Sequence, residues 1–331
     1  MSRSLERCAV AVVGAGVAGL CAATALLEAG ATVSVHERAD AVGASACSWL
    51  AGGMLAPDCE REGAETVVAE RGRLALDWWS QHVPGVVRGG TLVLAAPRDR
   101  GELRQFAART GGHVAVDAER IATLEPDLAE GFSEGLWLAD EAHLDPREAL
   151  PALAASLASR GVRFAFGAAV QPQTLAADHV IDCRGLAARE ALPDLRGVRG
   201  ERLLLRSRDV TLHRPVRLLH PRFSIYVVPR ADGLLMLGAT MLESDHAGPI
   251  TVRSALELLG AARALHPALA EAEIVEAAAG VRPAFPDNLP RLLRRGRVTH
   301  FNGLYRHGFL LAPWYATQLA ATLAAPAEVE A

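Results

Sequence analysis

Lysine is absent from this sequence of 331 residues, so all 34 basic residues are arginine. The absence excludes the lysine of a P-loop, the Schiff base of a pyridoxal phosphate enzyme and any lysine nucleophile. Arginine is always charged in proteins, and its planar guanidinium matches a carboxylate with two hydrogen bonds. The composition therefore favours the binding of anions over amine chemistry.

Patterns that hold metals or disulfides are missing as well. The five cysteines are widely spaced without a C-x-x-C pair, and the eleven histidines include no H-E-x-x-H, so we expect no metal site and no disulfide framework. A net charge of -4 gives no reason to expect nucleic acid or a membrane as partner. Glycines interrupt the apolar start of the chain, which a nucleotide-binding turn explains better than a signal peptide. We expect a cytoplasmic protein of about two domains, at roughly 150 residues per domain.

The first positive signal is the motif Gly14-x-Gly16-x-x-Gly19. It follows an apolar, strand-like run at 9–13 and opens a predicted helix at 17–28. Glycines at this spacing permit a tight turn, a close approach of the backbone to a pyrophosphate and close helix–strand packing. The helix N-terminus adds the positive end of its dipole. The motif therefore predicts a nucleotide-binding β-α-β unit.

The residues after this turn narrow the choice of nucleotide. A predicted strand at 32–36 leads to Glu37, at the position where a ribose hydroxyl is bound, and an acid there favours FAD or NAD over NADP. An NAD domain usually continues with further β-α units, whereas this chain has a loop rich in small residues at 41–54. Such a loop suits an extended cofactor running past it, although the pattern alone also fits a flexible surface loop.

Strand–helix alternation at both ends of the chain surrounds a region of strands without helices. Segments 202–206, 224–229 and 234–239 fit an antiparallel sheet. This order predicts an α/β fold (α+β overall) in which a Rossmann-like domain is interleaved with a domain built on an antiparallel sheet. The predicted nucleotide-binding domain covers residues 1–85, 140–198 and 276–331, and the predicted substrate domain covers residues 86–139 and 199–275.

A second glycine-punctuated turn, at 302–313, leads into a helix predicted at 312–323. The N-terminus of that helix can stabilise negative charge on a reduced flavin. Arg282 and Arg306 flank the turn, but spacing alone favours a surface or ion-pair role for either arginine.

Gly131-Phe-Ser133-Glu-Gly135 matches the nucleophile elbow of serine hydrolases. An elbow needs a strand before the serine and a helix after it, whereas here a strand-like segment at 136–138 follows. We therefore do not expect a serine hydrolase. The pair Trp78-Trp79 lies in a helical pattern and is predicted to be core.

Taken in this order, the motifs resemble the D-amino-acid oxidase superfamily, and most closely its glycine oxidase (ThiO) branch, over nearly the whole chain. Each motif by itself is unspecific, but their combination is specific. The resemblance rests on the glycine turn with Glu37 and on the segments Ala51–Ala56, Leu144–Pro146, Tyr226–Arg230, Gly238–Met241, Gly280–Pro283 and Tyr305–Pro313.

The resemblance implies non-covalent FAD and a small amino acid as substrate. Arg282 would clamp the substrate carboxylate with help from the Tyr226 hydroxyl, Arg306 would lie beside it, and Met241 would line the small pocket. No metal and no side-chain base are expected. The residues implied to bind FAD are Gly14, Gly16, Val17, Ala18, Gly19, Glu37, Arg38, Cys47, Ser48, Gly52, Gly53, Met54, Val170, Leu304, Tyr305, His307, Gly308, Phe309 and Leu310.

The implied reaction is amine oxidation. The flavin takes a hydride from glycine or a similar amino acid and passes the electrons to O₂, forming H₂O₂. The imine hydrolyses to glyoxylate and ammonia or serves the synthesis of the thiamine thiazole. Oxidation of a D-amino acid, of sarcosine or of a bulkier secondary amine remains an alternative, as do a flavin-dependent hydroxylase or dehydrogenase and a flavoprotein without enzymatic activity. Assembly into a homo-oligomer is left open.

Overall fold

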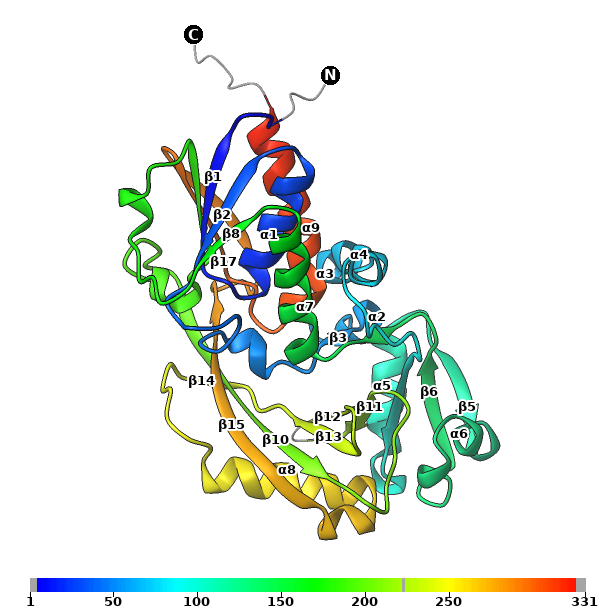
Figure 1. Cartoon of the computed structure of the whole chain (residues 1–331). Helices are drawn as coiled ribbons and strands as arrows, with labels where there is room; N and C mark the ends of the chain where they lie inside the picture. Colours follow the sequence, from blue (N-terminus) through cyan, green and yellow to red (C-terminus); the bar gives the residue numbers. More distant parts are fainter. Residues whose placement is uncertain (1–4, 222–223, 326–331) are drawn as a thin grey trace.

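Two large sheets organise the computed structural model, which describes residues 5–221 and 224–325 (Figure 1). In the first sheet all strands run parallel except the edge strand β16 (Arg291–Arg295). The order of its six strands is β16, β17 (Val298–Asn302), β9 (His179–Asp182), β1 (Ala9–Val13), β2 (Thr32–His36) and β8 (Arg163–Ala165).

The central position of β1 follows from its composition. Residues 10–13 are all buried, because both faces of a parallel strand are covered. Trp78 and Trp79 belong to the same apolar cluster as Val10 and Val12 of β1, which confirms their predicted place in the core. The helices of this half are α1 (Val17–Glu28), α2 (Pro57–Glu60), α3 (Thr66–Gly72), α4 (Leu74–His82), α7 (Pro146–Ser159) and α9 (Gly308–Ala324). In Figure 1, α1, α7 and α9 lie against one face of the sheet.

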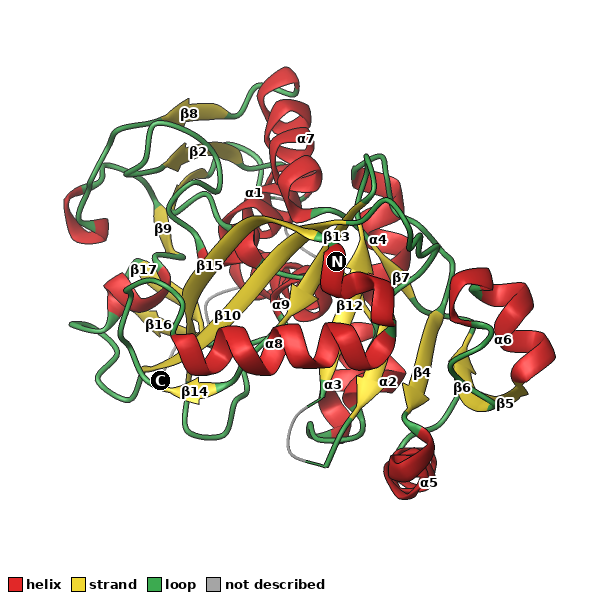
Figure 2. Ribbon diagram, turned by 90° about the horizontal axis from the view of Figure 1, so that it is seen from below, coloured by secondary structure: helices red, strands yellow, loops and turns green. Residues whose placement is uncertain are grey.

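The second sheet has nine strands and is antiparallel except where β4 (Thr91–Ala95) meets β11 (Val216–Leu219). Figure 2 shows the helix α8 (Val252–Leu265) crossing one face of this sheet. Helices α5 (Arg100–Arg109) and α6 (Ala118–Leu124) lie at its other end. Its remaining strands are β5 (Val114–Asp117), β6 (Glu134–Leu138), β10 (Arg196–Arg206), β12 (Ile225–Pro229), β13 (Leu234–Gly238), β14 (Leu242–Glu243) and β15 (Glu273–Ala284).

Short elements connect the two halves. A two-stranded sheet pairs β3 (Met54–Leu55) with β7 (Ala142–His143). The long strands β10 and β15 pair with each other along their length and reach from the first sheet to α8 (Figure 1). The 3-10 helices are η1 (Cys47–Leu50), η2 (Pro97–Asp99), η3 (Pro126–Leu128), η4 (Pro172–Thr174), η5 (Gly185–Ala188) and η6 (Pro267–Glu271).

This architecture confirms the predicted α/β class with parallel and antiparallel sheets. The domain limits predicted from the sequence stay predictions, and their ends at 1–4 and 326–331 lie outside the described residues. Ser133 precedes the strand β6 and not a helix, as expected for a chain without a nucleophile elbow. Within residues 5–221 and 224–325, none of the helices combines the length and apolar character that crossing a membrane requires.

The predicted start of the last helix, at 312, is wrong: α9 already begins at Gly308. Proline at 313 removes the N–H that would bond the carbonyl of Phe309. The indole of Trp79 donates to that carbonyl at 2.8 Å instead, so the helix continues through the proline. A tertiary contact thus extends the helix beyond what the local sequence predicts. In the second sheet, β10 begins earlier than the predicted segment 202–206, and β5, β11 and, in the first sheet, β16 are among the strands that were not predicted.

Candidate active site

A cavity of about 1380 Å³ is lined by residues of both large sheets and of the turns that join them. Pockets for drug-sized ligands measure roughly 300–1,000 Å³, so this cavity has room for an extended nucleotide and a small substrate together. The residues predicted to bind cofactor or substrate all line it, with the exception of Gly19. Their placement is thereby established, while the role of each residue stays a prediction.

One end of the cavity is the turn between β1 and α1. Gly14 has a φ of 105°, and a Cβ there would lie 2.7 Å from the carbonyl oxygen of Cys183, so glycine is required. A Cβ at Gly19 would lie 1.8 Å from the Gly14 carbonyl oxygen. Gly19 therefore allows α1 to pack against the turn, which is why it does not face the cavity.

Glu37 follows β2 and is buried beside this turn. Its carboxylate accepts hydrogen bonds from the N–H of Ala15 at 2.7 Å and from the N–H of Ala39 at 3.0 Å. The hydroxyl of Ser45 donates a third bond, also at 3.0 Å. These bonds hold the carboxylate at the cavity wall, where the sequence predicts that a ribose is bound.

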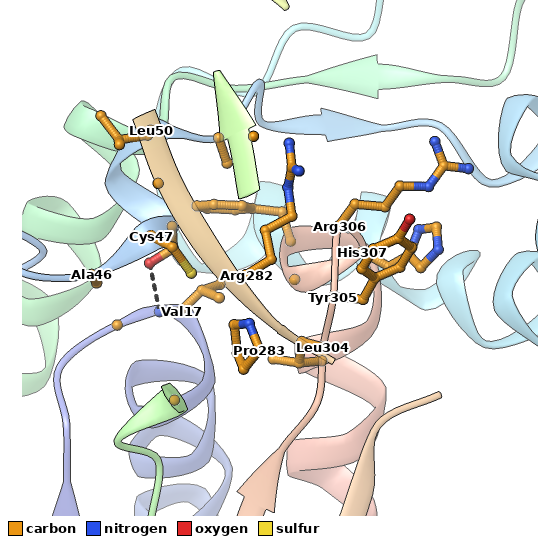
Figure 3. A pocket seen from close by; sticks show the side chains of 18 of the residues that line it. Val17, Ala46, Cys47, Leu50, Arg282, Pro283, Leu304, Tyr305, Arg306 and His307 are labelled. Carbon is orange, nitrogen blue, oxygen red and sulfur yellow. Dashed lines mark hydrogen bonds between the residues drawn. The ribbon is translucent and has the colours of Figure 1, made fainter. Parts of the chain in front are cut away.

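At the other end, Arg282 extends from β15 into the cavity (Figure 3). Its guanidinium donates to the carbonyl of Thr240 at 3.2 Å, and no carboxylate pairs with it within the described parts of the chain. Burial, with a smaller effect from the charge of Arg306, lowers the pKa of Arg282. A Cβ at Gly200 on β10 would lie 2.1 Å from Nη2 of Arg282. Glycine at 200 therefore provides the space that this guanidinium occupies.

Tyr226 on β12 lies opposite Arg217 on β11 in the antiparallel register. Arg217 donates to the Tyr226 hydroxyl and pairs with Glu62. It also donates to the Cys59 carbonyl at 3.4 Å and lies 5.3 Å from the ring centroid of Phe106. Burial raises the pKa of Tyr226, so the phenol stays neutral. Because its oxygen accepts from Arg217, the hydroxyl hydrogen is available to a ligand.

Arg306 and His307 meet the end of α2. Nη2 of Arg306 lies 2.5 Å from Oε2 of Glu60, and Nδ1 of His307 lies 3.6 Å from the same oxygen. Neither contact has hydrogen-bond geometry. Burial raises the pKa of Glu60, but the charge of Arg306, that of His307 in its protonated form at acid pH and that of Arg217 together hold it below its ordinary value. Burial lowers the pKa of His307 to about 4. At neutral pH the cluster thus combines an anionic Glu60 with a neutral His307.

Tyr305 and Met241 lie together at the same end of the cavity. The Tyr305 hydroxyl donates to Sδ of Met241 at 3.3 Å, and the Met241 side chain is largely exposed. Tyr305 has a φ of 51°, in the left-handed region that few residues other than glycine adopt. Its side chain, predicted to contact the cofactor, therefore lies beside residues predicted to bind the substrate (Figure 3).

Sequence reasoning missed the two acid–arginine pairs and the glycine that accommodates Arg282. Glu60, Glu62, Arg217 and Gly200 belong to no motif of recognisable spacing. Arg217 approaches Tyr226 through strand register, and Glu60 approaches Arg306 through the packing of the chain, so neither contact has a signal in the local sequence.

Comparison with known proteins identifies the family of this chain. The sequence profile described as DAO, FAD dependent oxidoreductase, matches residues 9–322. The chain belongs to this family. A Rhizobium etli protein, provisionally named thiamine biosynthesis oxidoreductase ThiO, is 56% identical over 95% of this chain and 96% of its own. A Bacillus licheniformis glycine oxidase is 28% identical over 91% and 89%. The crystal structure of glycine oxidase from Geobacillus kaustophilus matches with a TM-score of 0.79 at 24% identity, covering 96% and 95%.

The residues around the cavity fit FAD, the cofactor of the DAO family. The N-termini of α1 and α9 both border the cavity. The first N–H groups of a helix lack intrahelical partners and carry partial positive charge. At α1 they suit a pyrophosphate, and at α9, where the first helical bond joins Leu311 N–H to the His307 carbonyl, they suit the electron-rich end of a flavin. The predicted cofactor is thereby confirmed.

Proposed function

We propose that this DAO family protein oxidises glycine, or an amino acid of similar size, to its imine with FAD as cofactor and O₂ as electron acceptor. The observation that carries the proposal is Arg282, a guanidinium in the cavity wall without a carboxylate partner in the described residues. Such a group is suited to bind a substrate carboxylate. The names of the Rhizobium etli and Bacillus licheniformis relatives support glycine as the substrate.

Two side chains position the substrate in this mechanism. Arg282 binds the carboxylate by a charge-assisted pair of hydrogen bonds, and the Tyr226 hydroxyl donates a further bond. This arrangement holds the amino acid by one end and presents its Cα to the cofactor, which reduces the entropic cost of reaction. FAD, when bound, supplies the acceptor for the two electrons that leave the Cα–N unit and passes them to O₂, giving H₂O₂.

No side-chain base is needed, because the amine is deprotonated before it binds or as it binds. The amine must be neutral for a hydride to leave Cα, and it loses a proton as the imine forms. We therefore expect activity to rise with pH until the substrate amine is deprotonated. Water then hydrolyses the imine to an oxo acid, which is glyoxylate for glycine, and ammonia.

The test is anaerobic mixing of the purified holoenzyme with glycine while the absorbance of the flavin is followed. We expect glycine to bleach the flavin, and air to restore the colour with release of H₂O₂. A panel containing sarcosine, a D-amino acid and a bulkier secondary amine establishes the preference among substrates. A flavin that one of these bleaches but glycine does not would contradict the proposed substrate and retain the reaction class.

We further propose that the imine or glyoxylate serves synthesis of the thiamine thiazole, as the name of the Rhizobium etli relative suggests. Deletion of the gene should then cause a thiamine requirement, which growth without thiamine measures. We also propose a cytoplasmic location, since all five cysteines are free thiols.

A further inference from the structure

Three arginines border the substrate end of the cavity around Tyr226: Arg217, Arg282 and Arg306. Arg217 donates to the Tyr226 hydroxyl, and Arg306 is close enough to affect the electrostatics of Tyr226 and of Arg282. Three guanidinium groups in one partly buried site attract anions strongly unless they are neutralised. How they are neutralised therefore decides which substrates this site accepts.

Two of the three charges are cancelled by acids from one short segment. Glu60, the last residue of α2, pairs with Arg306, and Glu62, two residues later, pairs with Arg217. Arg282 has no such partner in the described residues. The cluster thus keeps one positive charge, which matches the charge of one substrate carboxylate.

The two pairs differ in how firmly each arginine is held. Arg217 keeps its contacts with the Tyr226 hydroxyl and the Cys59 carbonyl even without its acid. For Arg306, the carboxylate of Glu60 is the one partner within the described residues, and their contact lacks hydrogen-bond geometry. Removal of Glu60 would therefore release Arg306 to bind another anion, whereas removal of Glu62 would leave Arg217 in place.

We infer that Glu60 restricts this site to amino acids with a single carboxylate, because it pairs with Arg306, whose charge would otherwise be free to bind a second carboxylate. An aminodicarboxylate bound through Arg282 would bring its second carboxylate to the Arg306–Glu60 pair. The negative charge of Glu60 would repel this second carboxylate, and the carboxylate would lose its hydration on burial, so binding there is disfavoured. This inference rests on the proposed function, of which it specifies the substrate class.

The test compares Glu60→Gln with the matched control Glu62→Gln, each as holoenzyme, with glycine and with iminodiacetate, which is glycine bearing a carboxymethyl group on nitrogen. In Glu60→Gln, the second carboxylate of iminodiacetate can form a hydrogen-bonded charge pair with the freed Arg306. The kcat/KM for iminodiacetate, divided by the kcat/KM for glycine, should therefore be about tenfold or more higher than in the wild type. The ratio should change little in Glu62→Gln. Equal ratios in the wild type and Glu60→Gln, or an equal rise in both variants, would overturn the inference.

Titration calorimetry with acetate and malonate tests the same inference without turnover. The wild-type holoenzyme should bind malonate no more tightly than acetate, and Glu60→Gln should prefer malonate by about tenfold. A wild-type protein that already prefers malonate would contradict the inference even if the variant does not fold. If glycine is not oxidised but Glu60→Gln still acquires the malonate preference, the proposed function fails, while the selection of ligands with one carboxylate by Glu60 is supported.

Discussion

The two ends of the cavity bind charge in different ways. The nucleotide end is made mainly of backbone: a glycine turn and a helix N-terminus from one β-α-β unit, with Glu37 held by its neighbours. The substrate end is made of charged side chains that come from the end of α2 and the residues after it, from β11 and β15, and from the turn before α9. Binding at the nucleotide end requires that no side chain blocks the backbone N–H groups. Binding at the substrate end requires that one arginine is left without an acidic partner. The predictions below test this difference.

The largest effect is expected for Arg282→Ala. Loss of the two charge-assisted bonds to the substrate carboxylate, each contributing about 1.5–3 kcal/mol, should lower kcat/KM by roughly 10²–10⁴-fold, mainly through KM. Steady-state kinetics with glycine measures this effect. The flavin content should stay that of the wild type, because the nucleotide end is untouched, and an unchanged KM would refute the assigned clamp.

A second test uses the pH dependence of stability. Burial lowers the pKa of His307 from 6.5 to about 4. Between pH 6.5 and about 4, the unfolded chain binds a proton at His307 that the folded chain excludes. The free energy of unfolding therefore holds its full value above pH 6.5 and decreases as the pH falls to about 4. The total decrease in the free energy of unfolding that His307 causes is about 3 kcal/mol.

Denaturant unfolding at several pH values measures this loss, with His307→Gln as the control that cannot titrate. The stability of the variant should fall less steeply over this range. Identical slopes in both proteins would mean that His307 is not held neutral at the substrate end.

At the nucleotide end, Gly19→Ala should destabilise the protein by about 2 kcal/mol and weaken FAD binding. A Cβ there would lie 1.8 Å from a backbone oxygen that cannot move without opening the turn. The matched control is Gly63→Ala, since a Cβ at Gly63 meets no atom within 4 Å. Thermal unfolding and retained flavin compare the two variants, and equal values would exclude the packing role of Gly19.

The smallest effect is expected for Gly200→Ala, which reaches the substrate end through a backbone position. A Cβ would displace the flexible tip of Arg282 and leave the fold intact. We expect KM for glycine to rise about tenfold, as for the loss of one hydrogen bond to a charged group. Unfolding by denaturant should show unchanged stability, and a KM equal to that of the wild type would indicate that Arg282 binds substrate from another position.

The sequence predicts a site residue best where the backbone conformation or the packing at that position admits a single residue type. Gly14 and Gly16 line the cavity, and the sequence could point to them because a turn that needs positive φ or close backbone contact leaves little choice of residue. Arg282 was found through its family motif. Arg217 and Glu60 were not predicted, because arginine and glutamate occur throughout the chain and the spacing of these two residues matches no known motif.

The sequence by itself therefore determined the cofactor, the family and the parts of the fold that follow from periodicity and from glycine. The tertiary structure decided which charges remain free, because the partners of Arg217 and Arg306 come from a segment more than a hundred residues earlier in the chain. It also decided the start of α9, where the indole of Trp79 replaces the N–H that Pro313 lacks. Pairing in space depends on how elements pack, and local sequence does not encode that packing.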